Sequence, residues 1–347
     1  LPQRTIEKLH KYRVALFGAI TSKPNEEALS ELDESLKGKG YIYSSPIVGL
    51  IHKFNLDICV RPCRSYKGNP LNFIRRSKDD SIEEPFIDAV IFRQNTECLY
   101  SGVEWTNPPE NVYNALMTHP KFVENFGSVP KEELSVSTRI FTRKATERIL
   151  IAAFDYARKN GYPSVTVCEK PNVIRETSGL MWKIAKDLQK NIYTDIKLLN
   201  TNIDAQMMWL TKNPEDYGVI VAGNMFGDIV SDAFAGLIGG LGFACSAQFS
   251  EDGVAVFEPT HGSAPKYAGF EIPIVNPIAM IEATCMMLDY VGEALIARKI
   301  KNAIADVILE GRVRTYDMMR MQGKQEVLNS GAASTIEMTD AIISKIK

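Results

Sequence analysis

The segment Tyr217–Asp232, YGVIVAGNMFGDIVSD, constrains the fold of this chain more than any other. The apolar run Val219–Ala222 is typical of a buried strand, and the glycine and asparagine after it signal a turn. The next segment sets Asp228 and Asp232 four residues apart, so a helix there would place both carboxylates on one face. Two carboxylates aimed at one point from a strand end favour a hard divalent cation such as Mg²⁺ or Mn²⁺. The alternative is an N-capped helix with two solvated acids.

Composition narrows the class of protein. The chain has 347 residues, is 45% hydrophobic and carries a formal charge of −2, which is ordinary for a globular protein of two domains. The near-neutral charge gives no electrostatic footprint for nucleic acid or a membrane surface, and no apolar run is long enough to span a bilayer. The six cysteines form no CxxC pair, so we expect reduced buried thiols and a cytoplasmic protein. They are Cys59, Cys63, Cys98, Cys168, Cys245 and Cys285.

Strand and helix patterns alternate along the chain. This alternation predicts an α/β fold with a mostly parallel sheet, in which ligands bind beyond the carboxyl ends of the strands. Arg93, Lys170 and Asn224 lie at such ends, and residues 107–134 are a polar excursion from the core. The predicted strands cover residues 13–17, 58–60, 86–92, 135–142, 164–168 and 219–222, and the predicted helices cover 3–11, 26–36, 46–54 and 144–160.

Four further segments combine with YGVIVAGNMFGDIVSD to indicate a family. They are LDICVRPCRSYKGNP (56–70), FRQNTECLYSGVEW (92–105), EKPNV (169–173) and FEPTHGSAPKYAG (257–269). Together they resemble the β-decarboxylating dehydrogenases, which include isocitrate, isopropylmalate and homoisocitrate dehydrogenases. LDICVRPCRSYKGNP and YSGVEW look most like bacterial NADP-dependent isocitrate dehydrogenase. The resemblance implies an isocitrate/isopropylmalate dehydrogenase-like α/β fold in two domains, with the active site in the cleft between them.

The resemblance also implies a division of the chain. Residues 1–56 and 239–347 match the large cofactor-binding domain, and residues 57–238 match the small domain and dimer interface, with a clasp-like excursion at about 98–142. Family members begin with a strand, a Gly-Asp-Gly-rich turn and a further βαβ region. Because none of these is present, we expect this chain to be N-terminally truncated. We also expect a homodimer with shared active sites.

The family transfers a hydride from a 2-hydroxy acid to a nicotinamide and then removes the 3-carboxylate. Tyr100 matches its general acid, and Lys170 matches a base supplied by the partner subunit. In isolation, a packed tyrosine and a solvated lysine would be the better interpretations. The matched metal ligands are Asp204, donated across the dimer, with Asp228 and Asp232, and the matched substrate residues are Ser45, Arg61, Arg93 and Asn172. A planar arginine fork suits a substrate carboxylate.

The cofactor residues of the family are matched near the end of the chain. No G-x-G-x-x-G loop is present, but His261-Gly262-Ser263-Ala264 matches the family's cofactor loop, and Asn276 matches a position near the adenine. NAD-specific members usually carry an acid after Ala-Pro. Here two cations and two phenols match the NADP pattern around a 2′-phosphate, so we expect NADP. They are Lys266, Tyr267, Tyr316 and Arg320.

Three positions depart from the family pattern. Ile47 stands where isocitrate enzymes have asparagine, Ile51 stands where the family has its first arginine, and Gln94 replaces a glutamate. Losing one buried carboxylate partner should cost about 1.5–3 kcal/mol of substrate binding. Because LDICVRPCRSYKGNP and YSGVEW look most like isocitrate dehydrogenase, we still expect an isocitrate dehydrogenase that uses NADP and Mg²⁺ or Mn²⁺. The alternatives are a dehydrogenase for another 3-substituted malate, of the isopropylmalate or homoisocitrate type, and a non-catalytic regulatory subunit.

Overall fold

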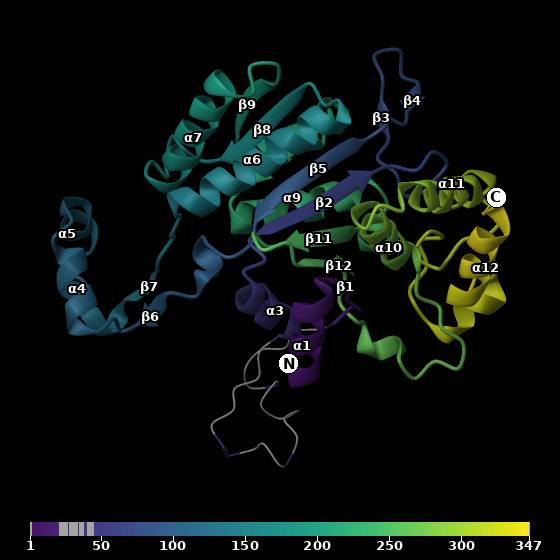
Figure 1. The fold of residues 1–347 in the computed structure, drawn as a ribbon, viewed down its shortest axis with the longest axis horizontal. Coiled ribbons are helices and arrows are strands. Elements are labelled where there is room, and N and C mark those ends of the chain that lie inside the picture. The colour runs from purple at the N-terminus through teal and green to yellow at the C-terminus, as the bar shows by residue number, and fades with distance from the viewer. Residues whose placement is uncertain (1, 21–26, 28–33, 35–37, 40–44, 347) are drawn as a thin grey trace.

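The structure is a computed structural model that describes residues 2–20, 27, 34, 38–39 and 45–346. Its centre is an eight-stranded sheet with strand order β1-β12-β11-β2-β5-β10-β8-β9 (Figure 1). Four of its strand pairings are parallel. Three are antiparallel, namely β12 with β11, β11 with β2, and β2 with β5. The α/β fold class with a mostly parallel sheet is confirmed. The strands are β1 (Val14–Leu16), β2 (Ile58–Arg64), β5 (Asp88–Gln94), β8 (Ser164–Glu169), β9 (Lys197–Asn202), β10 (Val219–Ala222), β11 (Cys245–Phe249) and β12 (Ala255–Pro259).

Helices cover both faces of this sheet. Helices α6 (Arg143–Asn160) and α7 (Thr177–Asn191) pack on one face, and α9 (Asn224–Leu237) packs on the other. Strand β10 shows how alternation produces this arrangement, because Val219 and Val221 join the cluster under α6 while Ile220 and Ala222 join the cluster under α9. Further α-helices of the body are α1 (Gln3–Tyr12), α3 (Pro46–Phe54), α8 (Ile203–Leu210), α10 (Ile278–Tyr290), α11 (Ala294–Glu310) and α12 (Thr335–Lys345). Among the described helices, none is long and apolar enough to cross a membrane.

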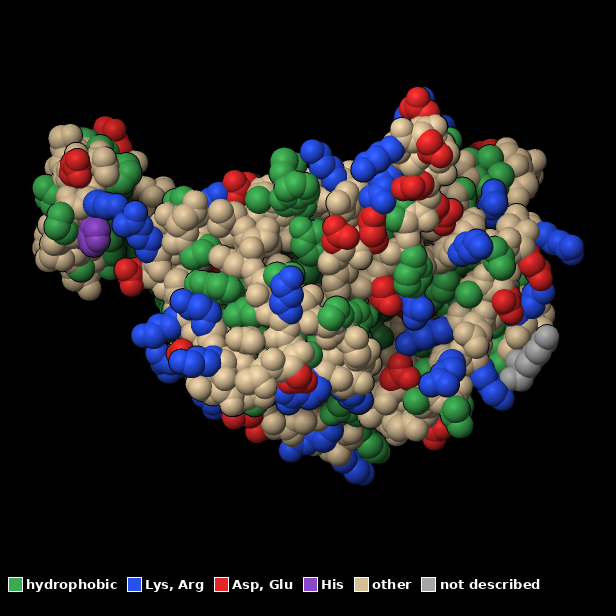
Figure 2. All heavy atoms as spheres, turned by 90° about the horizontal axis from the view of Figure 1, so that it is seen from above, with side chains coloured by type: hydrophobic (Ala, Val, Ile, Leu, Met, Phe, Trp, Pro, Cys, Tyr) green, Lys and Arg blue, Asp and Glu red, His purple; other side chains and the backbone are tan. Residues whose placement is uncertain are grey.

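An arm extends away from the body. Strands β6 (Glu104–Thr106) and β7 (Ser135–Ser137) pair antiparallel and carry helices α4 (Glu110–Met117) and α5 (Pro120–Phe126) at their far end (Figure 1). Figure 2 shows this arm as a separate lobe, and shows acidic and basic side chains interspersed over the body. A shorter hairpin is formed by β3 (Arg75–Arg76) and β4 (Ile82–Glu83), and short 3₁₀ segments occur at 99–101, 131–133, 214–216, 241–243, 265–267 and 325–330.

Most predicted elements are present, with small differences at their ends. The helix predicted at 46–54 and the strand at 219–222 have those bounds, whereas the helix predicted at 26–36 lies mostly outside the described residues. The strand predicted over 135–142 ends at Ser137, so the prediction is wrong beyond that residue. Ser137 pairs with Glu104, the first residue of β6, and β6 therefore offers no residue to pair with the positions after Ser137. All six cysteines are buried free thiols, as the sequence predicts. The two-domain division stays a prediction. Its proposed boundary crosses the sheet, where β11 pairs with β2.

A buried ion pair holds together the segments around the site. The Glu169 side chain, at the end of β8, is fully buried and accepts hydrogen bonds from Arg139 Nη2 at 2.8 Å, Ser178 Oγ at 2.6 Å and the Gly223 amide at 2.8 Å. These donors come from the segment before α6, the start of α7 and the turn before α9. Because a Cβ on Gly223 would lie 2.7 Å from Glu169 Oε1, only glycine fits this turn. The hydrogen bond from the Gly223 amide to Glu169 therefore fixes where α9 begins.

We predict that Glu169→Ala lowers the free energy of unfolding by about 3–5 kcal/mol, because it leaves the Arg139 guanidinium buried without its counter-ion. The measurement is urea denaturation followed by tryptophan fluorescence. Glu124→Ala on the exposed face of α5 is the control and should change stability by less than about 0.5 kcal/mol. Equal losses in the two variants would show that this ion pair does not hold the site segments together.

Candidate active site

Two arginines on neighbouring strands direct their guanidinium groups onto helix α9. Arg61 lies on β2 and Arg93 on β5, which pair antiparallel with Cys59 opposite Arg93. Arg61 Nη1 donates to Asp228 Oδ1 at 3.0 Å, to Asp232 Oδ1 at 3.1 Å and to Ser231 Oγ at 2.7 Å. One nitrogen of Arg61 therefore lies between the two carboxylates.

Arg93 binds the same helix one turn earlier. Its Nη1 donates to Asp228 Oδ1 at 2.5 Å and its Nε donates to Asn224 Oδ1 at 2.8 Å. The approach is close because Gly227 has no side chain: a Cβ there would lie 2.8 Å from the Arg93 Cβ. Burial and then the charge of Arg61 lower the pKa of Arg93. The two cations are held side by side because α9 supplies carboxylates to both.

Tyr100 completes the group around Asp228. Its hydroxyl donates to Asp228 Oδ2 at 3.4 Å, and the Arg93 guanidinium lies 5.7 Å from the centre of its ring. Burial and then the neighbouring Asp228 raise the pKa of Tyr100, so the phenol stays protonated at neutral pH. The structure thus brings five of the predicted site residues together, because Arg61, Arg93 and Tyr100 each contact Asp228 and Arg61 also contacts Asp232.

Arg61 and Arg93 also line a cavity of about 220 Å³. His261 lines it too, and so do Ile47 and Ile51 from α3. The two positions that depart from the family pattern therefore face the same space as the two arginines. Among the described residues, Arg61 Nε is buried and has no hydrogen-bond partner, and neither does the buried Ser45 Oγ at the start of α3. An orphaned buried donor costs free energy, so Arg61 Nε, in the lining of the cavity, suits an incoming acceptor.

The cavity contains polar residues that the sequence analysis missed. Asn95 Nδ2 donates to Gln248 Oε1 at 2.8 Å, and Gln248 in turn donates to Glu258. Burial raises the pKa of Glu258, and burial raises the pKa of the Cys59 thiol that also lines the cavity. A signal was available for two of them, since Glu258 is the acid of FEPTHGSAPKYAG and Asn95 follows Arg93 by two residues.

Lys170, Asp204 and Asn172 lie apart from this group. Lys170 follows β8 and forms an ion pair with Asp204 in the first turn of α8, and the Lys170 hydrogen bond lowers the pKa of Asp204. Asn172 is exposed in the next loop. Within the part of the chain that the structure describes, no ion pair joins Lys170 or Asp204 to Arg61, Arg93 or their carboxylates.

Asp228 and Asp232 provide only part of the ligand set that a divalent cation needs. Asp228 and Asp232 offer hard oxygen atoms one helical turn apart, and the Arg61 nitrogen between them marks a position where positive charge is accepted. Burial and then the charge of Asp228 raise the pKa of Asp232. No cluster of three or more His, Cys, Asp or Glu ligands occurs in the described residues, because Asp204 lies elsewhere. The donor set fits Mg²⁺ or Mn²⁺ with two carboxylates from this chain.

The predicted cofactor residues divide into two groups. The Lys266 ammonium lies 4.8 Å from the centre of the Tyr267 ring. The hydroxyl groups of Tyr316 and Tyr267 lie 3.4 Å apart. Arg320 is not part of this cluster, because its Nη2 donates to the Pro70 carbonyl at 3.2 Å. Asn276 is buried and donates to Asp317 at 3.0 Å. In the loop 261–264, His261 Nδ1 lies 2.9 Å from the Gly262 carbonyl, Ser263 is exposed and Ala264 has a φ of 45°.

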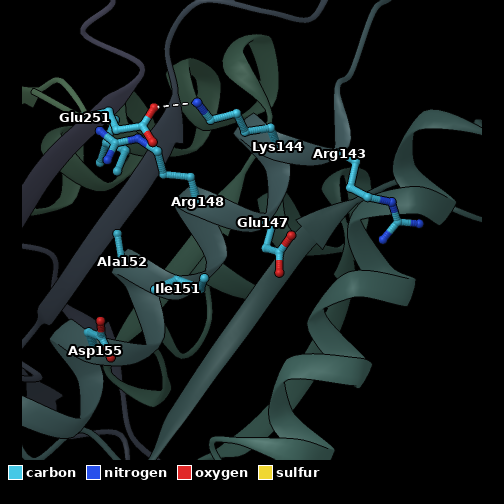
Figure 3. A pocket seen from close by; sticks show the side chains of 9 residues that line it. Arg143, Lys144, Glu147, Arg148, Ile151, Ala152, Asp155 and Glu251 are labelled. Carbon is cyan, nitrogen blue, oxygen red and sulfur yellow. Dashed lines mark ion pairs between the residues drawn. The ribbon is translucent and has the colours of Figure 1, made fainter.

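A second cavity, of about 730 Å³, lies over α6 and is shown in Figure 3. Its central cations are already paired. Lys144 contacts Glu251 at 2.6 Å, and Arg148 makes two hydrogen bonds to Asp57 Oδ1 at 2.7 and 2.9 Å. The smaller cavity is the better candidate for an active site, because three of the predicted site residues, Arg61, Arg93 and His261, line it and none of them lines the cavity over α6.

Comparison with known proteins gives one family. The family model described as isocitrate/isopropylmalate dehydrogenase matches residues 1–342. Protein DlpA of Legionella pneumophila is 36% identical over 343 residues, which is 99% of this chain and 50% of DlpA. Homoisocitrate dehydrogenase of Methanocaldococcus jannaschii is 38% identical over 90% of this chain and 78% of its own length. A crystal structure of isocitrate dehydrogenase from Methylococcus capsulatus has a TM-score of 0.77 and 32% identity, covering 100% of this chain and 85% of that one.

Proposed function

This chain belongs to the isocitrate/isopropylmalate dehydrogenase family, and we propose that it oxidatively decarboxylates isocitrate to 2-oxoglutarate with NADP and Mg²⁺ or Mn²⁺. The observation that carries the proposal is the meeting of Arg61, Arg93 and Tyr100 at Asp228, beside a cavity. Two guanidinium groups, a protonated phenol and two carboxylates are the groups that this reaction needs. Because the chain spans only half the length of DlpA, the activity, substrate and partners of the whole protein are proposals.

Each residue has a distinct task in this proposal. Arg61 and Arg93 bind substrate carboxylates through their paired N–H groups and hold the C2–H of the substrate toward the nicotinamide. Lys170 of the partner subunit accepts the proton of the 2-hydroxyl group as hydride leaves C2. Tyr100 donates its proton to the substrate carbon that loses CO₂, and its raised pKa keeps that proton available. A divalent cation held by Asp228 and Asp232 would supply charge stabilisation for the oxygen at C2.

The proposed dimer accounts for the lack of an ion pair between Lys170 and Asp228 in the described part of the chain. Large apolar side chains are exposed on α8 and α9, with Met208 at 46%, Trp209 at 43% and Ile229 at 44% of full exposure. Helices α8 and α9 pack together, so this face suits a second copy of the chain. In a symmetric dimer, Lys170 and Asp204 of one subunit would complete the site around Asp228 of the other.

We predict that inactive Lys170→Met protein and inactive Asp228→Asn protein recover activity when their subunits are exchanged. In each mixed dimer, one site combines native Asp228 with native Lys170 and the other carries both defects. Full exchange makes half of the dimers mixed, so recovery should reach about a quarter of wild-type turnover. Steady-state kinetics before and after exchange measure it. Failure to recover any activity, although mixed dimers form, would place Lys170 and Asp228 in a site built within one chain.

The proposed NADP preference rests on Lys266, Tyr267 and Tyr316, which lie together. We predict that Lys266→Asp combined with Tyr267→Ile shifts the ratio of kcat/KM for NAD over NADP at least about tenfold upward. The new carboxylate repels a 2′-phosphate and accepts from a 2′-hydroxyl. Lys299→Asp, on the exposed face of α11, is the control for a change in net charge and should leave the ratio unchanged. A wild type that already prefers NAD would refute the assignment.

Ile47 and Ile51 support a second candidate, a dehydrogenase for a malate with an apolar 3-substituent. Both side chains line the cavity where a third substrate carboxylate would need a cation. A homoisocitrate dehydrogenase and an isocitrate dehydrogenase are both among the relatives, so family membership leaves the acid open. The third candidate, a non-catalytic regulatory subunit, is disfavoured by the retained Tyr100, Lys170 and Asp228.

We predict that Ile51→Arg lowers the KM for isocitrate by about tenfold or more if isocitrate is the substrate, which corresponds to about 1.4 kcal/mol. If 3-isopropylmalate is the substrate, the same change should reduce its turnover by placing an unpaired cation against an alkyl group. Ile51→Met is the control, since it keeps volume without charge and should leave both KM values near wild type. Oxidation of neither acid by either variant would favour the regulatory subunit.

A further inference from the structure

One buried side chain that the proposed mechanism does not use, Arg139, joins the segment of the proposed acid to the segment of the proposed base. It lies between β7 and α6, and its side chain is only 9% exposed. Its Nε donates to Cys98 Sγ at 3.2 Å, and its Nη2 donates to Glu169 Oε2 at 2.8 Å. Cys98 precedes Tyr100 by two residues, and Glu169 directly precedes Lys170. One guanidinium group therefore binds next to both residues of the proposed proton transfers.

The turn that carries Tyr100 begins at a strained residue. Cys98 is completely buried and has a φ of 73° and a ψ of −154°, a backbone conformation that favours glycine and costs free energy for other residues. Its amide donates to the Ile140 carbonyl at 2.9 Å, and its thiol accepts from Arg139. Tyr100 itself is 48% exposed, so packing alone does not fix its ring. The contacts of Cys98 with residues 139–140 therefore set where this turn begins.

The main chain at Lys170 is held by the other end of the same guanidinium group. Arg139 Nη1 donates to Thr177 Oγ1 at 2.8 Å and to Ser178 Oγ at 2.9 Å. Ser178 Oγ donates to Glu169 Oε2 at 2.6 Å and accepts from the Lys170 amide at 3.4 Å. Arg139 thus binds the hydroxyl group that receives the Lys170 amide and the carboxylate of the residue before it.

Two aromatic rings hold the guanidinium group of Arg139 in this orientation. Its Cζ lies 4.5 Å from the centre of the Phe141 ring and 5.0 Å from the centre of the Phe226 ring, which belongs to α9. Because the N–H groups of arginine point in fixed directions in one plane, the group cannot turn toward one partner without losing another. A lysine ammonium has no such planar fork, so it cannot reproduce the bonds to both Cys98 and Glu169.

We propose that Arg139 is a positioning residue for both Tyr100 and Lys170. In the proposed dimer, Tyr100 acts in the site of its own subunit, whereas Lys170 acts in the site of the other subunit. Each Arg139 therefore serves two active sites, one through Cys98 and the other through Glu169. The inference rests on the proposed function, because it requires a base that is supplied across the dimer.

The first measurement is steady-state oxidation of isocitrate or 3-isopropylmalate, whichever wild type oxidises faster, with NADP and Mn²⁺. Arg139→Lys should lower kcat about a hundredfold, because a misplacement of about 1 Å at the reacting groups can cost that much. Its KM for the acid should stay within about twofold of wild type, because Arg61 and Arg93 are untouched. The matched control Arg158→Lys alters an exposed ion pair with Asp195 and should leave kcat and KM unchanged.

Subunit exchange then shows which sites Arg139 serves. Lys170→Met and Tyr100→Phe should complement each other to about a quarter of wild-type turnover, because one site of each mixed dimer combines native Tyr100 with native Lys170. Arg139→Lys should recover with neither of them. In each of its mixed dimers, both sites lack either a correctly placed acid or a correctly placed base.

Two smaller changes each break one of the two connections, and they remain informative if Arg139→Lys does not fold. Each should lower kcat at least about tenfold on its own. Cys98→Ala removes the acceptor for Arg139 Nε, so it should be rescued by Lys170→Met but not by Tyr100→Phe. Ser178→Ala releases the Lys170 amide, so it should show the reverse pattern. A general loss of structure would give both variants the same pattern.

Three results would overturn the proposal. They are a wild-type kcat in Arg139→Lys or in both smaller variants, rescue of folded Arg139→Lys by Lys170→Met or Tyr100→Phe, and one shared rescue pattern for Cys98→Ala and Ser178→Ala. The proposed function survives all three if Lys170→Met and Tyr100→Phe complement each other. If mixed dimers of those two variants form but stay inactive, or if wild type oxidises neither acid, the proposed function fails and the inference fails with it.

Discussion

The site depends on one electrostatic constraint: two arginines can be held next to each other in a largely buried place only if carboxylates lie within contact of both. Helix α9 meets this constraint with Asp228, which contacts Arg61 and Arg93, and with Asp232 one turn later. The constraint in turn requires a close approach of α9 to β5. Gly227 permits that approach, because any larger residue would collide with the Arg93 side chain.

The rest of the fold brings these elements together. Strand β10 ends at Ala222, and the Gly223 amide donates to the buried Glu169, so the start of α9 is tied to the end of β8. Strands β2 and β5 pair in a register that places Arg61 and Arg93 on the same face of the sheet, two residue pairs apart. Packing, register and one buried ion pair thus determine where the charged groups meet.

Much of this could be predicted from local patterns. The apolar run 219–222 and the turn after it were sufficient to predict β10 and α9, and the four-residue spacing was sufficient to place Asp228 and Asp232 on one face. What could not be predicted involves long-range contacts. Arg61 and Asp228 are 167 residues apart, and only the folded sheet shows that the arginine binds the proposed metal ligands.

Two further differences have local causes. The polar composition of residues 107–134 hid helices α4 and α5, since a small arm on two short strands has little apolar core to produce a clear periodicity. The sequence analysis did not identify Glu258 as a site residue. Its position beside Gln248 in the cavity lining depends on long-range packing, which residue spacing does not predict. The sequence analysis identified Ile47 and Ile51 as departures from the family pattern, and the structure adds that they line the same cavity as Arg61.

The most direct test of the account is the position of Mn²⁺, determined by anomalous diffraction from crystals of the protein grown with Mn²⁺ and isocitrate. The account predicts one strong peak within coordination distance of the carboxylates of Asp228 and Asp232, with Asp204 of the partner subunit as a third ligand and with the bound acid against Arg61 and Arg93. A peak elsewhere would contradict it.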